Sequence, residues 1–408
     1  MSSLSKNLPS DPSSNIKING KFLLIICISL IATSGVFSIN PIVPNIATAF
    51  NISPQNIGLI MTSFLLPPTV GSLFFGALAD RFGIKKILIP SLIIFGIGGI
   101  LCALANNFRS LLEWRFLTGI GAASLESLEL TLISDLYNGK MLTSAMGVNG
   151  AMIGVAATIY PLIGGALASF SWRYPFLLSV LAFPLALLIA TKLKLPTQQK
   201  NTQHLNLKSY LKNTWENINN PQVFGLLFTV FCMFIIELGA CYIYIPVYAS
   251  NFLGASGTDI GILLSCESIA FALVASQLGL LARWFSEKSL IVSGFVICVL
   301  SLLIIPTIHN VWLLIIPCII FGVSQALALP PLQSMLAGIA PEGYRAGFMA
   351  LNVTVQSLGR ALGPLFGGVT FAAWGIQGVF YANAALALIT VVVFSFLLTK
   401  RSLKSSNA

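Results

Sequence analysis

Charge is scarce in this sequence. Its 22 basic and 12 acidic residues make up 8% of the 408 positions, whereas soluble proteins carry about 25% charged residues. A soluble fold of this length could not cover its surface with so few charges, so the soluble protein classes are excluded.

The histidines and cysteines of this sequence do not indicate a catalytic or metal-binding site. The only two histidines, His204 and His309, fall between apolar runs, and all seven cysteines fall inside apolar runs. Cysteines in such positions serve as small hydrophobic residues and not as a disulfide framework or a metal cluster. The sequence also has no phosphate-binding loop and no pairing of a nucleophile with histidine. We therefore expect no metal, no cofactor and no enzymatic activity.

Long apolar runs dominate what remains. Apolar residues account for 56% of the chain, and the mean hydropathy is +0.90. A helix needs about 20 apolar residues to cross about 30 Å of hydrocarbon. Runs of that length predict an all-α polytopic membrane protein with twelve spans: 22–48, 57–79, 87–105, 110–136, 143–169, 174–194, 222–249, 258–282, 289–306, 311–338, 346–373 and 378–399.

A polar stretch at 195–220 divides the spans into two groups of six. The predicted organisation is a tail (1–20), a six-helix bundle (21–194), a linker (195–220), a second bundle (221–399) and a tail (400–408). The first 20 residues are polar, so we expect no cleavable signal peptide.

The basic residues gather on one side of the predicted spans. The net charge of +10 raises the question of nucleic acid binding, but a bilayer explains it better. The loops opposite the termini carry only Arg109 and Arg173, while Arg115 and Arg360 fall within spans and the other basic residues share the side of the termini. Because cytoplasmic loops collect Lys and Arg, both termini are predicted to be cytoplasmic, in a plasma membrane (for a bacterium, the inner membrane).

The two halves of the chain repeat each other. A shift of 203 residues aligns them without a gap over most of their length. The aligned pairs include Ile57-Gly58 with Ile260-Gly261, Gly76 with Gly279, Gly119 with Gly322, Met146 with Met349, Asn149 with Asn352, Pro161 with Pro364, and Gly164-Gly165 with Gly367-Gly368. Six spans return the chain to the same side, so the halves should be related by a pseudo-twofold axis along the membrane normal. Transporters use this arrangement to place a substrate site between two bundles.

The loop between spans two and three reads Gly76-Ala-Leu-Ala-Asp80-Arg81-Phe82-Gly83-Ile-Lys-Lys. It closely resembles the signature loop of the major facilitator superfamily, and with the spans and the repeat the resemblance covers the whole chain. The resemblance implies the major facilitator fold and a cytoplasmic gate formed by Gly76, Asp80, Arg81 and Gly83. A solvated loop charge is the alternative for Asp80, whose position in the second half is taken by an arginine.

Two further segments resemble the twelve-span, proton-coupled drug antiporters of that superfamily. Arg115-Phe-Leu-Thr-Gly-Ile-Gly-Ala-Ala on span four is similar to their Arg-Gly-Gly-Ala motif, which adds Arg115 to the gating residues. On span five, Tyr160-Pro161-Leu-Ile-Gly164-Gly165 resembles their antiporter motif, with Tyr160 where the motif has glycine. The second half keeps the Gly-Pro form at Gly363-Pro364 and Gly367-Gly368. These glycines and prolines also have a helix-packing role.

Acidic residues within spans are functional candidates, because an ionisable group at bilayer depth costs about 2.5–3.5 kcal/mol or more. Glu126 and Glu129 lie three residues apart on one face of span four. Their mutual repulsion and poor solvation favour proton binding. Glu237 lies near the middle of span seven, where similar antiporters also carry coupling carboxylates. We predict that Glu126, Glu129 and Glu237 carry protons; the alternative is hydrogen bonding inside the bundle.

Arg360 lies near the middle of span eleven. It stays charged at physiological pH and so needs an anion. It either forms a permanent ion pair with Glu267 or Glu237, or binds a carboxylate or phosphate of the substrate. The second option favours an amphiphilic or anionic solute, such as a drug or a siderophore. The predicted substrate-binding residues are Arg360, Glu267, Tyr160, Tyr242, Tyr244, Gln325 and Gln356.

The sequence thus predicts a monomeric secondary transporter that exports its solute by proton antiport and alternating access. Its expected partners are a small-molecule substrate, protons and membrane lipid, and not nucleic acid. A proton-coupled importer of an organic acid or metabolite would use the same carboxylates and remains the alternative. An intramembrane enzyme using Glu126 and Glu129, or a non-transporting sensor or lipid scramblase, fits less well.

Overall fold

The computed structural model describes residues 20–137, 139–193, 221–339 and 345–399. Within these ranges the chain is helical and has no strand, as expected for a backbone that must satisfy its own hydrogen bonds in lipid. The predicted linker 195–220 and the predicted tails lie outside the described residues, apart from Gly20 at the start of the first helix.

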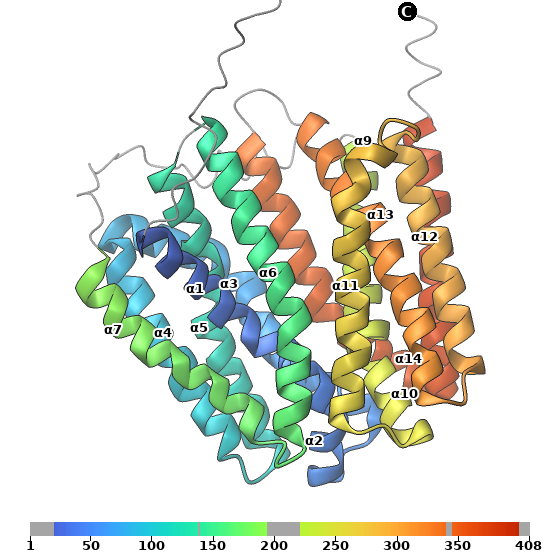
Figure 1. Cartoon of the computed structure of the whole chain (residues 1–408), viewed down its shortest axis with the longest axis horizontal. Coiled ribbons are helices and arrows are strands. Elements are labelled where there is room, and N and C mark those ends of the chain that lie inside the picture. The colour runs from blue at the N-terminus through green and yellow to red at the C-terminus, as the bar shows by residue number, and fades with distance from the viewer. Residues whose placement is uncertain (1–19, 138, 194–220, 340–344, 400–408) are drawn as a thin grey trace, which may run out of the picture.

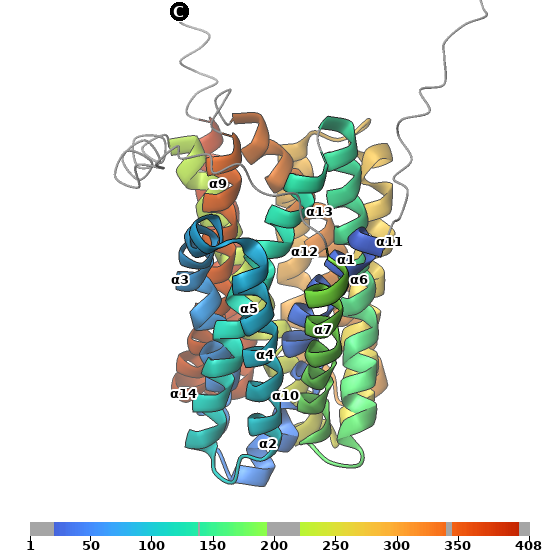
Figure 2. The same cartoon turned by 90° about the vertical axis from the view of Figure 1, so that its left-hand side faces the viewer.

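The helices form two bundles, which Figure 1 shows side by side and Figure 2 shows with the N-terminal bundle in front. The N-terminal bundle contains α1 (Gly20–Phe37), η1 (Asn40–Ile42), α2 (Val43–Phe50), η2 (Pro54–Asn56), α3 (Leu59–Phe82), α4 (Ile84–Ala103), α5 (Phe108–Leu136), α6 (Gly139–Ala168), η3 (Tyr174–Leu181) and α7 (Ala182–Lys192). The C-terminal bundle contains α9 (Pro221–Ile236), η4 (Glu237–Cys241), α10 (Tyr244–Leu253), α11 (Gly257–Leu281), α12 (Glu287–Ile304), η5 (Ile305–Thr307), η6 (Val311–Leu314), α13 (Ile315–Ile339) and α14 (Arg345–Thr399).

The described helices are consistent with twelve spans. Within the described ranges, ten segments are long and apolar enough to cross a membrane. One of them, Leu351–Leu397, contains two spans, because Gly375 has φ 69° and ψ −169° and breaks α14 into a first arm (345–374) and a second arm (376–399). The 24-residue helix α3, packed against α5 and α14, adds the remaining crossing.

Two spans that the sequence predicts as continuous helices are interrupted. The first span breaks after α1 into the 3-10 turn η1, because Pro41 and Pro44 lack the N–H groups that a regular helix needs. The seventh span passes from α9 into the π-helix η4, where the Tyr242 N–H donates to the Glu237 carbonyl. Such π turns are frequent at functional sites.

We call the face where α1 begins and α14 ends the terminal face, and the face where α2 and α10 lie the distal face (Figure 1). Near the distal face, four glycines bring the bundles into backbone contact, because each has a carbonyl of the other bundle where a side chain would lie. These contacts, which we call the distal seal, are Gly165 with Gly257, Gly261 with Pro161, Gly58 with Pro364, and Gly368 with Gln55. Gly58 and Gly261 are equivalent in the 203-residue repeat, as are Gly165 and Gly368, so the pseudo-twofold axis duplicates the seal.

Hydroxyl groups add hydrogen bonds between the bundles. The donors and carbonyl acceptors are Thr62 to Ala361 (3.1 Å), Thr69 to Ser357 (3.1 Å), Ser265 to Thr158 (2.6 Å) and Ser268 to Ala157 (3.2 Å). At the break in the first span, by contrast, Asn40 is fully buried and neither polar atom of its carboxamide has a hydrogen-bond partner among the described residues.

The same helices separate toward the terminal face. Beyond the Ser268–Ala157 hydrogen bond, Gly154, Gly150 and Gly147 of α6 and Gly279 of α11 have no described neighbour within 4 Å of the place where a side chain would begin. Figure 1 shows α6 and α11 approaching each other at the lower end and diverging toward the upper end. Among the described residues the bundles therefore meet on the distal side, which we call the closed side, and diverge toward the terminal face, which we call the open side.

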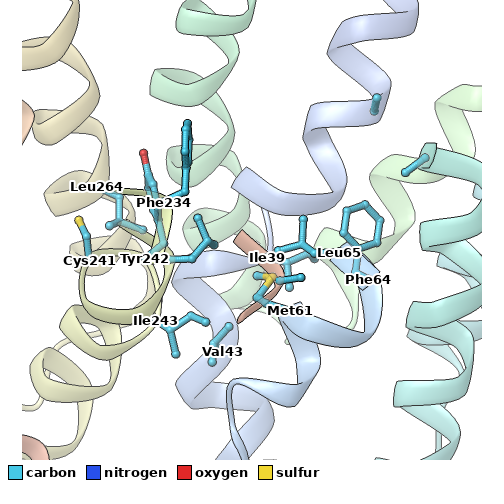
Figure 3. Close-up of a cluster of buried hydrophobic side chains, with 14 of the residues drawn as sticks. Ile39, Val43, Met61, Phe64, Leu65, Phe234, Cys241, Tyr242, Ile243 and Leu264 are labelled. Carbon is cyan, nitrogen blue, oxygen red and sulfur yellow. The ribbon is translucent and has the colours of Figure 1, made fainter. Parts of the chain in front are cut away.

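A plug of buried apolar side chains reinforces the closed side. Figure 3 shows that residues of the N-terminal bundle face residues of the C-terminal bundle across the interface. The labelled members are Ile39, Val43, Met61, Phe64 and Leu65 from the first bundle and Phe234, Cys241, Tyr242, Ile243 and Leu264 from the second. All are less than 9% exposed, so this layer excludes water between the centre of the protein and the distal face.

Candidate functional site

Arg360 is the central cation of the interior. It lies on the first arm of α14, between Ser357 and Ala361, whose carbonyls bond to α3. The side chain is half-buried, and its guanidinium carbon lies 4.6 Å from the centre of the Phe234 ring. Among the described residues, no carboxylate lies within 4.0 Å of Arg360 and no group forms a hydrogen bond with it. In this conformation the arginine therefore forms no contact ion pair with Glu237 or Glu267.

Two carboxylates from different bundles act on Arg360 from beyond contact distance. Glu126 of α5 and Glu237 at the start of η4 both interact electrostatically with the guanidinium, and both side chains are half-buried. The attraction holds the cation in place without occupying its N–H groups. The planar fork of Arg360 is consequently available for a planar anion.

Glu267 lies deeper, on α11. It is 4% exposed, and its Oε2 accepts hydrogen bonds from the Tyr242 hydroxyl (3.0 Å) and the Ser268 hydroxyl (3.2 Å). It also interacts electrostatically with Glu237. Tyr242 directly follows η4 and packs edge-on against Phe37 of the other bundle, with ring centres 6.0 Å apart. The π turn begins at Glu237 and is followed directly by Tyr242, so it joins the Glu237 carboxylate to a residue that packs in the distal interface between the bundles.

Glu129 belongs to a separate polar chain inside the N-terminal bundle. Asn149 of α6 donates to Glu129 Oε1 (3.1 Å), and Ser29 of α1 donates to Asn149 Oδ1 (2.7 Å). Glu129 is 5% exposed, and its Oε2 has no hydrogen-bond partner among the described residues. Ser29 also interacts with the Glu129 carboxylate. Because Glu126 interacts with both Glu129 and Arg360, it connects this chain to the central cation.

The predicted tyrosines occupy different surroundings. Tyr244 is fully buried, donates to the Pro54 carbonyl (3.3 Å) and stacks on Phe371, so it packs within the distal closure and does not face an open space. Tyr160 is half-buried on α6 and lies near Cys27 of α1. We call Arg360, Glu126, Glu237 and Glu267 the charged cluster. Of the three predicted tyrosines, only Tyr242 contacts a member of this cluster, Glu267, among the described residues.

The two predicted glutamines also separate. Gln356 is half-buried on α14, one helical turn before Arg360, and so shares a helix face with it. Gln325 is 7% exposed and lines a small pocket inside the C-terminal bundle with Met233 and Cys298. Gln356 is therefore the better placed of the two for a ligand of Arg360.

Arg115, predicted as a gating residue, is 1% exposed. Its Nε donates to the Ile60 carbonyl (3.1 Å), its Nη1 donates to the Gly35 carbonyl (3.0 Å), and its guanidinium lies 4.2 Å from the centre of the Phe64 ring. The arginine therefore fastens α1 and α3 to α5. This arrangement supports a role in holding the N-terminal bundle together.

Replacing Arg115 with alanine is expected to lower the stability of the folded protein markedly. The change removes two hydrogen bonds from a charged, buried donor, and each bond of this kind contributes about 1.5–3 kcal/mol. The midpoint of thermal unfolding in detergent measures the effect. Arg109→Ala is the control, since Arg109 forms only an exposed ion pair with Glu113, and such pairs contribute little. Equal midpoints for the two variants would contradict the fastening role.

The predicted signature loop joins α3 to α4. Gly83 ends α3 with φ 93°, a conformation that side-chain-bearing residues rarely adopt, and its N–H donates to the Ala79 carbonyl (2.7 Å). Arg81 is exposed and lies over the Phe82 ring. The side chain of Asp80 and the surroundings of Gly76 lie outside the described part of the structure, so the predicted gate stays a prediction.

Phe234 and the Ser29–Asn149 pair are site components that sequence reasoning missed. Asn149 carries a usable signal, because asparagine recurs at Asn352 in the repeat and a polar residue at bilayer depth needs a partner. Phe234 carries no such signal, since one phenylalanine in an apolar run looks like any other.

The cluster offers exchangeable protons and one fixed cation. Among the described residues, no group of three His, Cys, Asp or Glu side chains is placed to hold a metal ion. Glu126 and Glu237 interact with a guanidinium that cannot lose its charge, while Glu129 interacts with Glu126 and Glu267 interacts with Glu237. This arrangement suits the binding of a charged solute linked to proton uptake and release.

Comparisons with known proteins give consistent matches over most of the chain. The family model described as Major Facilitator Superfamily matches residues 25–254 and 248–408. Multidrug resistance protein 2 of Bacillus subtilis is 25% identical over 363 residues, covering 86% of this chain and 88% of that protein. Quinolone resistance protein NorA of Staphylococcus aureus is 26% identical over 365 residues, covering 88% and 92%. A bacterial homolog of the human lysosomal transporter Spinster, in an inward-facing and unoccupied conformation, superposes with a TM-score of 0.79 at 17% identity, over 92% of this chain and 96% of that chain.

Proposed function

Because the chain belongs to the Major Facilitator Superfamily of membrane transporters, we propose that it exports small amphiphilic solutes in exchange for protons. The names of its relatives, a multidrug resistance protein and a quinolone resistance protein, support a drug-like substrate. The expected solute carries an anionic group that binds Arg360.

One observation carries this proposal. Arg360 interacts electrostatically with one carboxylate of each bundle, Glu126 and Glu237, and its N–H groups have no partner among the described residues. A half-buried cation with unoccupied N–H groups is able to bind an anion that arrives from the open side. Since the two carboxylates belong to different bundles, ligand and proton binding both affect how the bundles meet.

The direction of transport follows from the predicted orientation. If the termini are cytoplasmic, the terminal face is the inner face and this conformation is open to the cytoplasm. A solute enters, its anion binds Arg360, and rocking of the bundles opens the distal seal. Protons from outside then bind Glu126 or Glu237 and accompany the return step. Each charge moved down the membrane potential supplies about 2.3 kcal/mol per 100 mV.

Exchange requires that solute and proton compete. A positive group on the solute favours ionised Glu126 and Glu237 and so displaces protons, which produces antiport. A solute with only negative charge would instead favour the protonated carboxylates and travel with protons, which is symport. The proposed substrate is therefore zwitterionic or otherwise carries a proton-displacing group beside its anion.

The proposal is tested in everted membrane vesicles with a preformed pH gradient. A fluoroquinolone is the first probe, because it carries both a carboxylate and an amine. Its addition should dissipate the gradient in vesicles that contain the protein and not in vesicles without it. The proposal fails if none of the tested zwitterions, cationic dyes and siderophores dissipates the pH gradient. If an organic acid is instead accumulated together with protons, the protein is an importer.

Replacing Arg360 with alanine should weaken transport of carboxylate-bearing substrates and spare simple cationic dyes. A hydrogen bond to a charged group contributes about 1.5–3 kcal/mol, which corresponds to a roughly 10- to 150-fold loss of affinity. Arg360→Lys keeps the charge but loses the planar fork, so it should fall between wild type and Arg360→Ala. Unchanged affinity together with a lower unfolding midpoint would instead assign Arg360 a structural role.

A further inference from the structure

Two lysines at equivalent positions of the repeat have different surroundings. Lys85 in the first turn of α4 aligns with Lys288 in the first turn of α12. In the N-terminal bundle, the ammonium group of Lys85 donates to the Ala190 carbonyl near the end of α7, at 3.0 Å. The lysine therefore bridges α4 and α7 at the terminal face.

Lys288 forms no such bridge. The position equivalent to Ala190 is Val393, on the second arm of α14, and Lys288 makes no hydrogen bond or ion pair with any described residue. A groove of about 570 Å³ lies between the two helices instead. Its lining consists of Lys288, Ser289, Val292, Ser293 and Val296 from α12 and Phe394 and Ser395 from α14.

The groove is polar at one end and apolar along its length. Lys288 and Ser289 lie in the first turn of α12, at the level where the span begins. Val292 and Val296 follow at successive helical turns on the same face, and buried Phe394 forms part of the wall. Val296 is 43% exposed, so in a membrane this surface faces acyl chains. A cation at the membrane surface above an apolar channel matches the chemistry of a lipid.

We propose that this groove binds one anionic phospholipid of the leaflet at the terminal face. Its phosphate lies at Lys288 and Ser289, and one acyl chain follows Val292 and Val296 against Phe394. Lysine binds phosphate as a point charge, and anionic lipids are attracted by about 1 kcal/mol per basic residue near the surface. The pseudo-equivalent crevice offers no such site, because Lys85 is already bonded to the backbone.

The test uses the full-length protein in detergent, with lipid retention measured by native mass spectrometry. After incubation with equal amounts of phosphatidylglycerol and phosphatidylcholine, wild type should retain one phosphatidylglycerol in preference. Lys288→Gln should lower phosphatidylglycerol affinity about fivefold. Val292→Trp fills the groove without changing its charge and should lower retention of both lipids.

Lys192→Gln is the matched control, because Lys192 is an exposed lysine at the terminal end of α7 and its repeat equivalent is Ser395. It should retain lipid as wild type does. Equal retention of the two lipids by wild type, or equal losses in Lys288→Gln and Lys192→Gln, would overturn the site. If inorganic phosphate alone displaces the lipid completely, the acyl channel has no role and the proposal fails.

Discussion

Replacing Glu237 with glutamine should abolish uphill transport while leaving downhill exchange of the solute. Glutamine keeps the size of the side chain but cannot exchange a proton. A gradient of 100 mV supplies about 2.3 kcal/mol per charge, enough for a roughly 45-fold solute ratio. In proteoliposomes with an imposed proton gradient, we expect that ratio in wild type and a ratio near one in Glu237→Gln.

Glu113→Gln is the control for this change, because Glu113 lies at the distal end of α5 in an exposed ion pair with Arg109. It should accumulate solute as wild type does. If Glu237→Gln still builds a gradient, Glu237 does not carry the proton. The same assay on Glu126→Gln and Glu129→Gln then identifies the carrier, since Glu126 is the carboxylate that connects Glu129 to Arg360.

Replacing Gly261 with leucine should stop the distal seal from closing. Gly261 faces the Pro161 carbonyl of the other bundle, and backbone cannot move aside as a flexible side chain can. Overpacking of this kind costs about 1–3 kcal/mol or more, which shifts the ratio of the two conformations roughly 5- to 150-fold toward the distally open one.

Gly279→Leu adds the same side chain to the same helix and should act in the opposite direction. Five helical turns separate Gly279 from Gly261, so both lie on the face of α11 that meets α6, but Gly279 has no described neighbour within 4 Å. A bulky group there obstructs closure of the terminal side. The distance between spin labels at Met141 and Leu280, attached in a background without native cysteines, measures the opening of the terminal side. Double electron–electron resonance gives this distance. Distances that shift the same way in both variants would exclude this assignment.

Much of the architecture was predictable because lipid imposes strong constraints on sequence. Span length, charge scarcity and the 203-residue repeat together predict two six-helix bundles, and most helix ends agree within a few residues. The interruptions at η1 and η4 escaped prediction for different reasons. Pro41 and Pro44 signal a break that their apolar neighbours conceal, whereas the π turn at Glu237 depends on how α9 packs against α14.

The site was predictable in its ionisable members and not in its geometry. Charge at bilayer depth is rare enough to single out Glu126, Glu237 and Arg360 from sequence. Which of them meet depends on how two bundles face each other, and single-sequence periodicity does not contain that information. For this reason Tyr244 was expected in the substrate cavity, while the structure packs it between Pro54 and Phe371 in the distal closure.

The buried carboxamide of Asn40, at the break in the first span, bears on the transport cycle. Asn40 is fully buried, and neither polar atom of its carboxamide has a hydrogen-bond partner among the described residues. A buried polar group without a hydrogen bond costs about 1–3 kcal/mol. This cost is removed when the distal side opens and water can form hydrogen bonds with the Asn40 carboxamide. The unpaired carboxamide therefore makes the distally closed conformation less stable than its other contacts would make it, which favours the opening of this side.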